Sequence, residues 1–199
     1  MAELFIGLMS GTSLDGVDGV LADVGANKFT VLAHADAPLP VGLRAELLAL
    51  NTPGQNELHR AALAANALMQ VYASVVAQLM CTTATSPTAA RAIGAHGQTV
   101  RHQPQNHIGL SGKGYTLQLS NPALLAELTG IDVVADFRNR DVAAGGQGAP
   151  LVPVFHQAAF GRQGHTTAVL NLGGMANLTV IGPKLTNDLL GFDCGPGNV

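Results

Sequence analysis

The stretch FIGLMSGTSLDGVDGVLADV, residues 5–24, holds the pattern that decides the fold. Two apolar segments, typical of buried strands, flank a segment rich in glycine, hydroxyl side chains and carboxylates. A tight hairpin turn needs about two residues, and this connection is longer. Its composition is typical of a loop that holds a ligand, and a decorated turn without a ligand is the alternative.

A second stretch, TTAVLNLGGMANLTVIG at residues 166–182, follows the same plan. An apolar strand runs into paired glycines, a small polar turn follows, and an apolar strand leaves. We interpret the two stretches as a weak internal duplication in which each opens one of two related domains. We predict a first domain over residues 1–162 and the start of a second over residues 163–199, with the two loops facing each other across a cleft to hold a polyphosphate.

The rest of the pattern predicts a mixed α/β chain. We expect strands at residues 3–9, 17–24, 28–37, 115–119 and 131–137, and helices at 41–50, 56–80, 122–130 and 151–160. Residues 91–100 are expected to form a buried strand that ends in a polar loop. Asn121 is expected to cap the third of these helices. DVAAGGQGAP, residues 141–150, is predicted to be a glycine-rich loop.

Composition argues against several functional classes. The 199 residues carry a net charge of −3 without any Lys/Arg cluster, which disfavours binding to nucleic acid. The N-terminus lacks the features of a signal peptide, and the two cysteines show no disulfide or zinc spacing, so we expect a cytoplasmic protein. Residues 61–80 lack charge, but their polar side chains recur every four residues opposite an apolar stripe, which indicates a core helix instead of a membrane span.

The opening loop lacks the P-loop signature GxxxxGK[ST] but suits phosphate binding in another way. Gly11, Thr12, Ser13 and Gly16 can present backbone N–H groups and hydroxyls to phosphate oxygens. The carboxylates of the loop would repel bare phosphate. They are explained if Mg²⁺ and its waters lie between, with Asp15 as the water-mediated metal contact.

Five segments, in order and over almost the whole chain, resemble the anhydro-N-acetylmuramic acid kinases of peptidoglycan recycling. They are GLMSGTSLDGVDGVLADV, AHGQTVRHQP, ADFRNRDVAAGGQGAPLVP, LNLGGMANLT and GFDCGPGN. The combination is specific, although each motif alone is weak. The resemblance implies the two-domain ATPase fold shared by sugar kinases, hexokinase and actin, with ATP and Mg²⁺. The implied reaction opens the 1,6-anhydro bond of 1,6-anhydro-N-acetylmuramic acid with water and phosphorylates O6, giving N-acetylmuramic acid 6-phosphate.

The resemblance also implies site residues. It places a first phosphate loop at Gly11, Thr12, Ser13, Leu14, Asp15, Gly16, Val17 and Asp18, and a second at Gly173, Gly174, Met175, Ala176 and Asn177. It places the catalytic aspartate at Asp193, before CGPGN, a sharp loop expected to fix the carboxylate at a strand end. A carboxylate in the cleft can activate the attacking water as a general base. An aspartate that caps a turn is the alternative.

Substrate contacts are expected from three segments. His96 and Gln98 leave a predicted buried strand and can bond sugar hydroxyls or the N-acetyl group. Arg138 can pair with the lactyl carboxylate of a muramic sugar, because a guanidinium matches a carboxylate. Gln147 lies in GGQGAP, which we expect to line the cleft. An ordinary loop histidine and a surface arginine are the alternatives, and Arg140 could simply pair with Asp141.

We therefore expect a cytoplasmic ATP-dependent sugar kinase with an actin-like ATPase (ribonuclease H-like) fold, its first domain near complete and its second truncated. Residues 1–199 alone are expected to be nearly inactive, and the resemblance implies a homodimer for the complete protein. Two alternatives remain open. One is a non-catalytic module of the same fold that binds nucleotide or sugar, and the other is a kinase for a different sugar.

Overall fold

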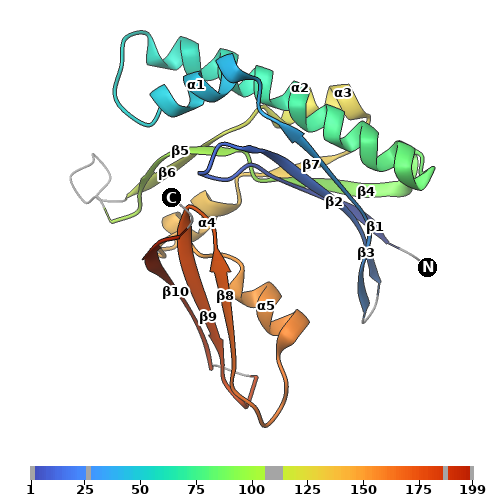
Figure 1. The fold of residues 1–199 in the computed structure, drawn as a ribbon, viewed down its shortest axis with the longest axis vertical. Helices are drawn as coiled ribbons and strands as arrows, with labels where there is room; N and C mark the ends of the chain where they lie inside the picture. Colours follow the sequence, from blue (N-terminus) through green and yellow to red (C-terminus); the bar gives the residue numbers. More distant parts are fainter. Residues whose placement is uncertain (1–2, 26–27, 106–113, 186–187, 198–199) are drawn as a thin grey trace. The chain divides into compact units, whose positions relative to one another are not determined.

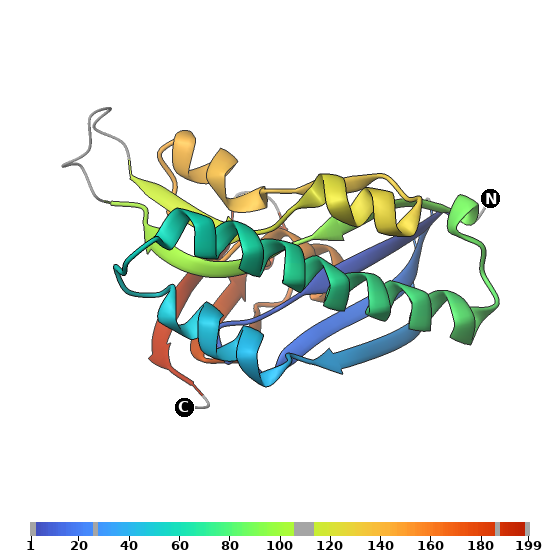
Figure 2. The ribbon, with the colours of Figure 1, turned by 90° about the horizontal axis from the view of Figure 1, so that it is seen from above.

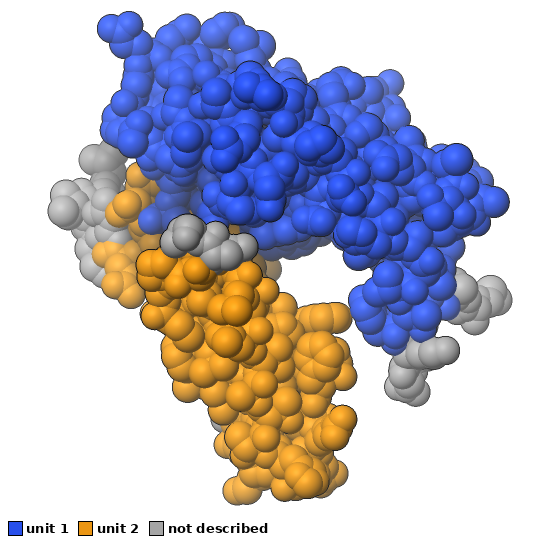
Figure 3. Space-filling view, viewed as in Figure 1, with its two compact units in different colours: residues 1–102, 117–137 blue, residues 103–116, 138–199 orange. Residues whose placement is uncertain are grey.

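The computed structural model describes residues 3–25, 28–105, 114–185 and 188–197. The chain forms two compact units, each described here by itself (Figure 3). Unit 1 comprises residues 1–102 and 117–137, and unit 2 comprises residues 103–116 and 138–199. This grouping assigns residues 138–162 to the same unit as the later strands, and the predicted domain boundary at residues 162 and 163 stays a prediction.

Unit 1 is built on a mixed five-stranded sheet of order β3-β2-β1-β4-β7. An antiparallel meander opens the chain, and two strands that run parallel to β1 complete the sheet. The strands are β1 (Leu4–Met9), β2 (Gly16–Gly25), β3 (Lys28–Pro38), β4 (Ala90–Ala95) and β7 (Val133–Ala135). This arrangement confirms the predicted α/β fold class, and the three strands of the meander lie where their apolar patterns predict.

Helices cover one face of this sheet, as Figures 1 and 2 show. They are α1 (Val41–Ala49), α2 (Glu57–Thr83) and α3 (Pro122–Thr129). The centre of the core lies under α2, where Leu68, Tyr72 and Leu79 are fully buried. Gly19 in β2 lets the helix approach, because a Cβ there would meet the Val75 side chain. By length and composition α2 could cross a membrane, but half of its most apolar window is buried in the structure, as in a core helix.

The buried strand expected within residues 91–100 is β4, which ends at Ala95. The polar segment after it is only partly a loop: β5 (Gln98–Gln103) begins after a short break, where Gly97 takes a positive φ of 76°. A short 3-10 helix, η1 (Pro87–Ala89), precedes β4, and β5 pairs with β6 (Tyr115–Leu119). The cap of α3 is confirmed, since the side chain of Asn121 accepts a hydrogen bond from the Leu124 backbone N–H.

The loop predicted at residues 141–150 is wrong in its first part. α4 (Phe137–Ala143) occupies that stretch, and the strand expected at 131–137 shrinks to β7 because Asp136 takes a positive φ of 63°. Only Val142 of this short helix is buried, so no apolar periodicity marked it. The glycine-rich loop begins after the helix.

Unit 2 contains a three-stranded antiparallel sheet of order β10-β9-β8. Its elements after α4 are α5 (Pro153–Phe160), β8 (Thr167–Leu172), β9 (Met175–Ile181) and β10 (Leu189–Pro196). Like unit 1, it contains an antiparallel meander whose first connection is a glycine-bearing loop. α5 packs on the sheet face of Thr179, where His156 Nδ1 lies 2.9 Å from Thr179 Oγ1 and both residues are buried.

The opposite face of this sheet is apolar. Strand register aligns Leu170, Leu178 and Phe192 in one row across β8, β9 and β10, and Ala168, Val180 and Leu190 in the next. Of these side chains, Leu170 is 57% exposed and Leu190 is 58% exposed. An apolar sheet face of this kind is normally covered by another layer of structure.

Candidate active site

The first glycine-bearing loop connects β1 to β2 in unit 1 and is fixed from beneath. The Leu14 N–H donates to the Gly11 carbonyl, and Leu14, at a positive φ of 55°, is almost completely buried. Arg44 Nε donates to the Leu14 carbonyl at 2.9 Å. Thr12 and Ser13 remain exposed. The loop therefore has an anchored base and an exposed rim of backbone and hydroxyl groups, as a phosphate cradle needs.

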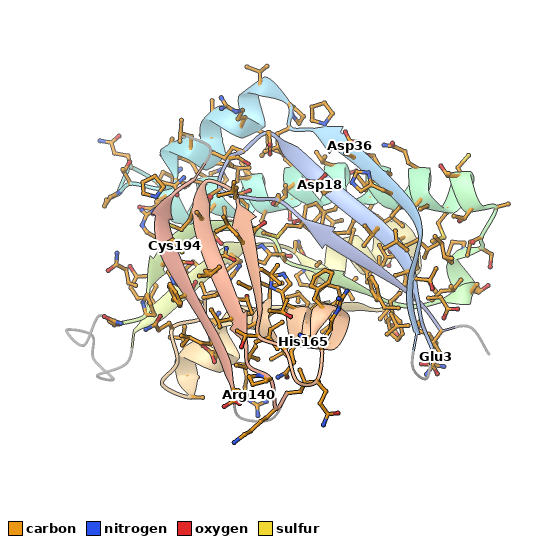
Figure 4. The ribbon with its side chains drawn as sticks, turned by 60° about the horizontal axis from the view of Figure 1, so that its bottom comes forward. Glu3, Asp18, Asp36, Arg140, His165 and Cys194 are labelled. Carbon is orange, nitrogen blue, oxygen red and sulfur yellow. The ribbon has the colours of Figure 1, made fainter. Side chains whose placement is uncertain are left out.

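The two carboxylates of this loop have different surroundings. Asp15 Oδ1 accepts hydrogen bonds from Ser13 Oγ and from the Gly16 N–H, both at 2.9 Å, so this carboxylate shapes the loop. Asp18 lies opposite Asp36 on the neighbouring strand (Figure 4). The Oδ1 atom of Asp18 is 3.3 Å from His34 Nε2. Within the described part of the chain, no group of three His, Cys, Asp or Glu could hold a metal ion.

His96 and Gln98 lie beside the first loop, because β1 and β4 run parallel and end side by side. The backbone N–H of His96 donates to the Leu8 carbonyl at 3.0 Å, and the side-chain Nε2 of Gln98 donates to the Gly11 carbonyl at 3.1 Å. Gln98 is only 1% exposed, and its buried Oε1 has no hydrogen-bond partner among the described residues. The amide of Gln98 therefore supports the first glycine-bearing loop directly.

Gly97→Ala is expected to lower the free energy of unfolding by at least about 2 kcal/mol. Gly97 has a positive φ of 76°, and a Cβ there would lie 2.6 Å from the Leu119 carbonyl oxygen. Gly130→Ala is the matched control, since Gly130 has a φ of 69° and a Cβ there would meet no atom within 4 Å. Urea denaturation of both variants separates the steric contact from the backbone strain. Equal losses for the two variants would show that Leu119 moves aside at little cost.

The second glycine-bearing loop, Gly173 and Gly174, connects β8 to β9 in unit 2. It is held from the side by the residue that follows β10, because the Gly197 N–H donates to the Gly174 carbonyl at 3.1 Å. Gly197 must be glycine at this approach, because a Cβ there would collide with the Gly173 carbonyl oxygen. The loop backbone is therefore ordered by its neighbours, as a fixed anion-binding turn requires.

Strand register places Asp193 in a polar row beside this loop. Asn171 of β8, Asn177 of β9 and Asp193 of β10 are direct cross-strand partners, so they share one face of the sheet. Asn177 Oδ1 is buried and has no hydrogen-bond partner among the described residues. The sequence did not identify Asn171 as a site residue. Its signal was an amide inside the apolar strand AVLNL, just before the paired glycines.

The expectation that Asp193 marks a strand end is wrong. β10 continues to Pro196, and the register shifts between Asp193 and Gly195, which has a φ of 144°. The glycines of CGPGN therefore distort the strand instead of ending it. Such irregularities re-aim side chains and are common beside active sites.

Arg138 and Asp141 of α4 hold the glycine-rich loop that follows it. Arg138 Nη1 donates to the Gly148 carbonyl, and the Gly148 N–H donates to Asp141 Oδ2, both at 2.7 Å. Burial lowers the pKa of the Arg138 guanidinium, and the charge of Asp193 acts in the opposite direction. The charge of Asp193 therefore acts on the Arg138 guanidinium. Among the described contacts, Asp141 forms a hydrogen bond with the glycine-rich loop and no ion pair with Arg140. Gln147 is exposed on the same loop.

The predicted residues fall into two groups. Unit 1 brings the first loop together with His96 and Gln98, and unit 2 brings the second loop together with Asn177, Asp193 and Arg138. That both groups face one cleft stays a prediction.

Comparisons with known proteins bear on the whole chain. The sequence profile of the family described as anhydro-N-acetylmuramic acid kinase matches residues 3–199. Relatives with that name from Albidiferax ferrireducens and Variovorax paradoxus are 64% and 63% identical, over 100% and 98% of this chain and 55% and 52% of their own length. The chain thus spans about half the length of the curated relatives it matches.

A solved structure shows the same fold at low sequence similarity. It is a reductive activator for a corrinoid, iron-sulfur protein, with a TM-score of 0.54 and 13% identity, and the match covers 98% of this chain and 31% of that one. The likeness supports the fold and nothing about the chemistry.

Proposed function

Because the chain belongs to the anhydro-N-acetylmuramic acid kinase family, we propose that a full-length protein containing these residues phosphorylates 1,6-anhydro-N-acetylmuramic acid with ATP while water opens the anhydro ring. The two products are N-acetylmuramic acid 6-phosphate and ADP. The observation that carries the proposal is the placement of Asp193 in one row with Asn177, beside the second glycine loop and within the electrostatic reach of Arg138.

The proposed step begins with a water molecule between Asp193 and the anomeric carbon. Asp193 accepts a proton as the water oxygen bonds to that carbon, and the bond from the anomeric carbon to O6 breaks. The released O6 takes the γ-phosphoryl group, and ADP leaves. Phosphoryl transfer asks the protein mainly for positioning and charge neutralisation.

The two glycine loops supply that positioning. We propose that the first loop, Gly11 to Asp18, and the second, Gly173 to Asn177, hold the phosphates from opposite sides. Mg²⁺ would neutralise phosphate charge when bound, held mainly by the nucleotide, with Asp15 reaching it through a water. The anchored Leu14 and the Gly197–Gly174 hydrogen bond keep the loops ordered before the nucleotide arrives.

Sugar recognition is proposed for His96, Arg138 and Gln147. One donor of Arg138 is fixed on the Gly148 carbonyl, which orients the guanidinium so that other donors can bind the lactyl carboxylate. Gln98, being buried, would act on the sugar site through the loop it supports.

We also propose a cytoplasmic location, where ATP is available. Cys81 and Cys194 are both free and exposed, which fits a reducing compartment. The homodimer implied by the family resemblance remains part of this proposal and can be checked by sedimentation of the full-length protein.

The test is a coupled ADP-release assay of the full-length protein with 1,6-anhydro-N-acetylmuramic acid. We expect one ADP and one phosphosugar per turnover, with oxygen from labelled water at the anomeric carbon. The matched substrate is 1,6-anhydro-N-acetylglucosamine, which lacks the lactyl carboxylate and should be turned over at least about tenfold more slowly, since an unpaired Arg138 is left behind. Sugar binding without ADP release would instead identify a non-catalytic module, and equal rates on both sugars would remove the muramic specificity.

A further inference from the structure

One buried hydroxyl group of α2 lies beneath both loops of unit 1. Tyr72 is fully buried, and its hydroxyl oxygen is 3.2 Å from Ser10 Oγ and 3.1 Å from the backbone nitrogen of Gly97. Ser10 Oγ in turn donates to the Gly97 carbonyl at 3.2 Å. Three groups from distant parts of the sequence thus meet at one point in the core.

The directions of these hydrogen bonds follow from the available protons. The Gly97 N–H can only donate, so the Tyr72 oxygen accepts from it. Ser10 has a single hydroxyl proton, and that proton is directed to the Gly97 carbonyl. The Tyr72 hydroxyl must therefore donate to Ser10 Oγ. Burial raises the pKa of Tyr72 to about 12, so the hydroxyl keeps its proton at neutral pH.

The hydrogen bonds among Tyr72, Ser10 and Gly97 join two segments of the proposed site. Ser10 is the first residue of the loop after β1, and Gly97 lies between His96 and Gln98 after β4. Leu8 and Ala95 are neighbours at the ends of the parallel strands, and Gln98 Nε2 bonds back to the Gly11 carbonyl. The relative position of the phosphate loop and the sugar-side turn is thus set by Tyr72 and Gln98 together.

We propose that Tyr72 is a positioning residue for phosphoryl transfer, whose hydroxyl holds the first phosphate loop in register with the His96–Gln98 turn. This inference rests on the proposed function of the same site. Tyr72 touches no substrate, since it is buried beneath both segments. Its contribution is to the geometry of the loops, where a displacement of about 1 Å can cost about a hundredfold in rate.

The test is Tyr72→Phe in the full-length protein, which removes the hydroxyl and keeps the ring in the core. We expect kcat to fall about tenfold or more with the KM for ATP changed less than about twofold, because the loop is displaced and not deleted. Thr83→Val is the matched control. It removes a hydroxyl from the same helix, one that donates to the Leu79 carbonyl at 2.8 Å and lies in neither loop.

A second measurement does not depend on catalysis. Hydrogen exchange of the full-length protein should show faster exchange of the Gly97 amide in Tyr72→Phe than in the wild type or in Thr83→Val. A wild-type protein without ADP release would refute the proposed function, while the exchange result would still judge the hydrogen bond. A Tyr72→Phe protein with kcat within about twofold of wild type, or a Thr83→Val protein that loses as much, would overturn the positioning role.

Discussion

Asp193→Asn in the full-length protein is expected to lower turnover by about 10²–10⁴-fold, the usual range for loss of a general base. The substitution keeps the size and shape of the side chain and removes its ability to accept the water proton. The cross-strand pairing of Asp193 with Asn177 belongs to the backbone and is retained. ATP affinity should therefore stay within about twofold of the wild type, because a base and not a phosphate contact is lost.

The measurement combines the ADP-release assay with calorimetric titration of ATP. Asp188→Asn is a suitable control, since Asp188 is an exposed residue of the same unit just before β10 and outside the polar row. We expect its turnover to match the wild type. If Asp193→Asn also kept wild-type turnover, another residue would have to activate the water.

Residues 1–199 alone are expected to release ADP from ATP and the anhydro sugar at least about a thousandfold more slowly than the full-length protein, since positioning by a complete site contributes that much or more. The chain spans about half the length of the curated relatives it matches. The proposed site draws on both units, so any further contacts that belong to the relatives' remaining length would be lacking. Robust turnover by residues 1–199 would show that the two described groups suffice.

This comparison needs a control for folding. Circular dichroism and urea denaturation of residues 1–199 should show a cooperative transition for unit 1, whose core is continuous from the sheet to α2. A folded chain without turnover would assign the loss to the site, and an unfolded one would assign it to stability.

Local patterns predicted most of the fold. The apolar strands around Gly7 and Gly19, the amphipathic α2 and the Asn121 cap each depend on contacts that a short window of sequence encodes. The short helix α4 was not predicted from a local pattern. Its stability comes from contacts with the loop after it, such as the hydrogen bond that Asp141 accepts from the Gly148 N–H. The break at Gly97 likewise depends on the neighbouring Leu119 backbone, which lies far away in the sequence.

The candidate site was predictable as a set of motifs but not as a geometry. The resemblance named Asp193 and Asn177, while their direct pairing, and the addition of Asn171 to the same row, depend on strand register. Gln98 was expected at the sugar, yet its burial under Gly11 gives it a supporting position. Tyr72 carried no signal at all, since a tyrosine in an apolar stripe is indistinguishable from a core residue until its hydroxyl partners are known.

The two apolar rows on the exposed face of β8, β9 and β10 affect the solution behaviour of the chain. Leu170, Leu190 and Phe192 expose apolar surface to water, and such surfaces associate with one another. We therefore expect purified residues 1–199 to aggregate at high protein concentration and in kosmotropic salts, and a mild detergent to reduce this aggregation.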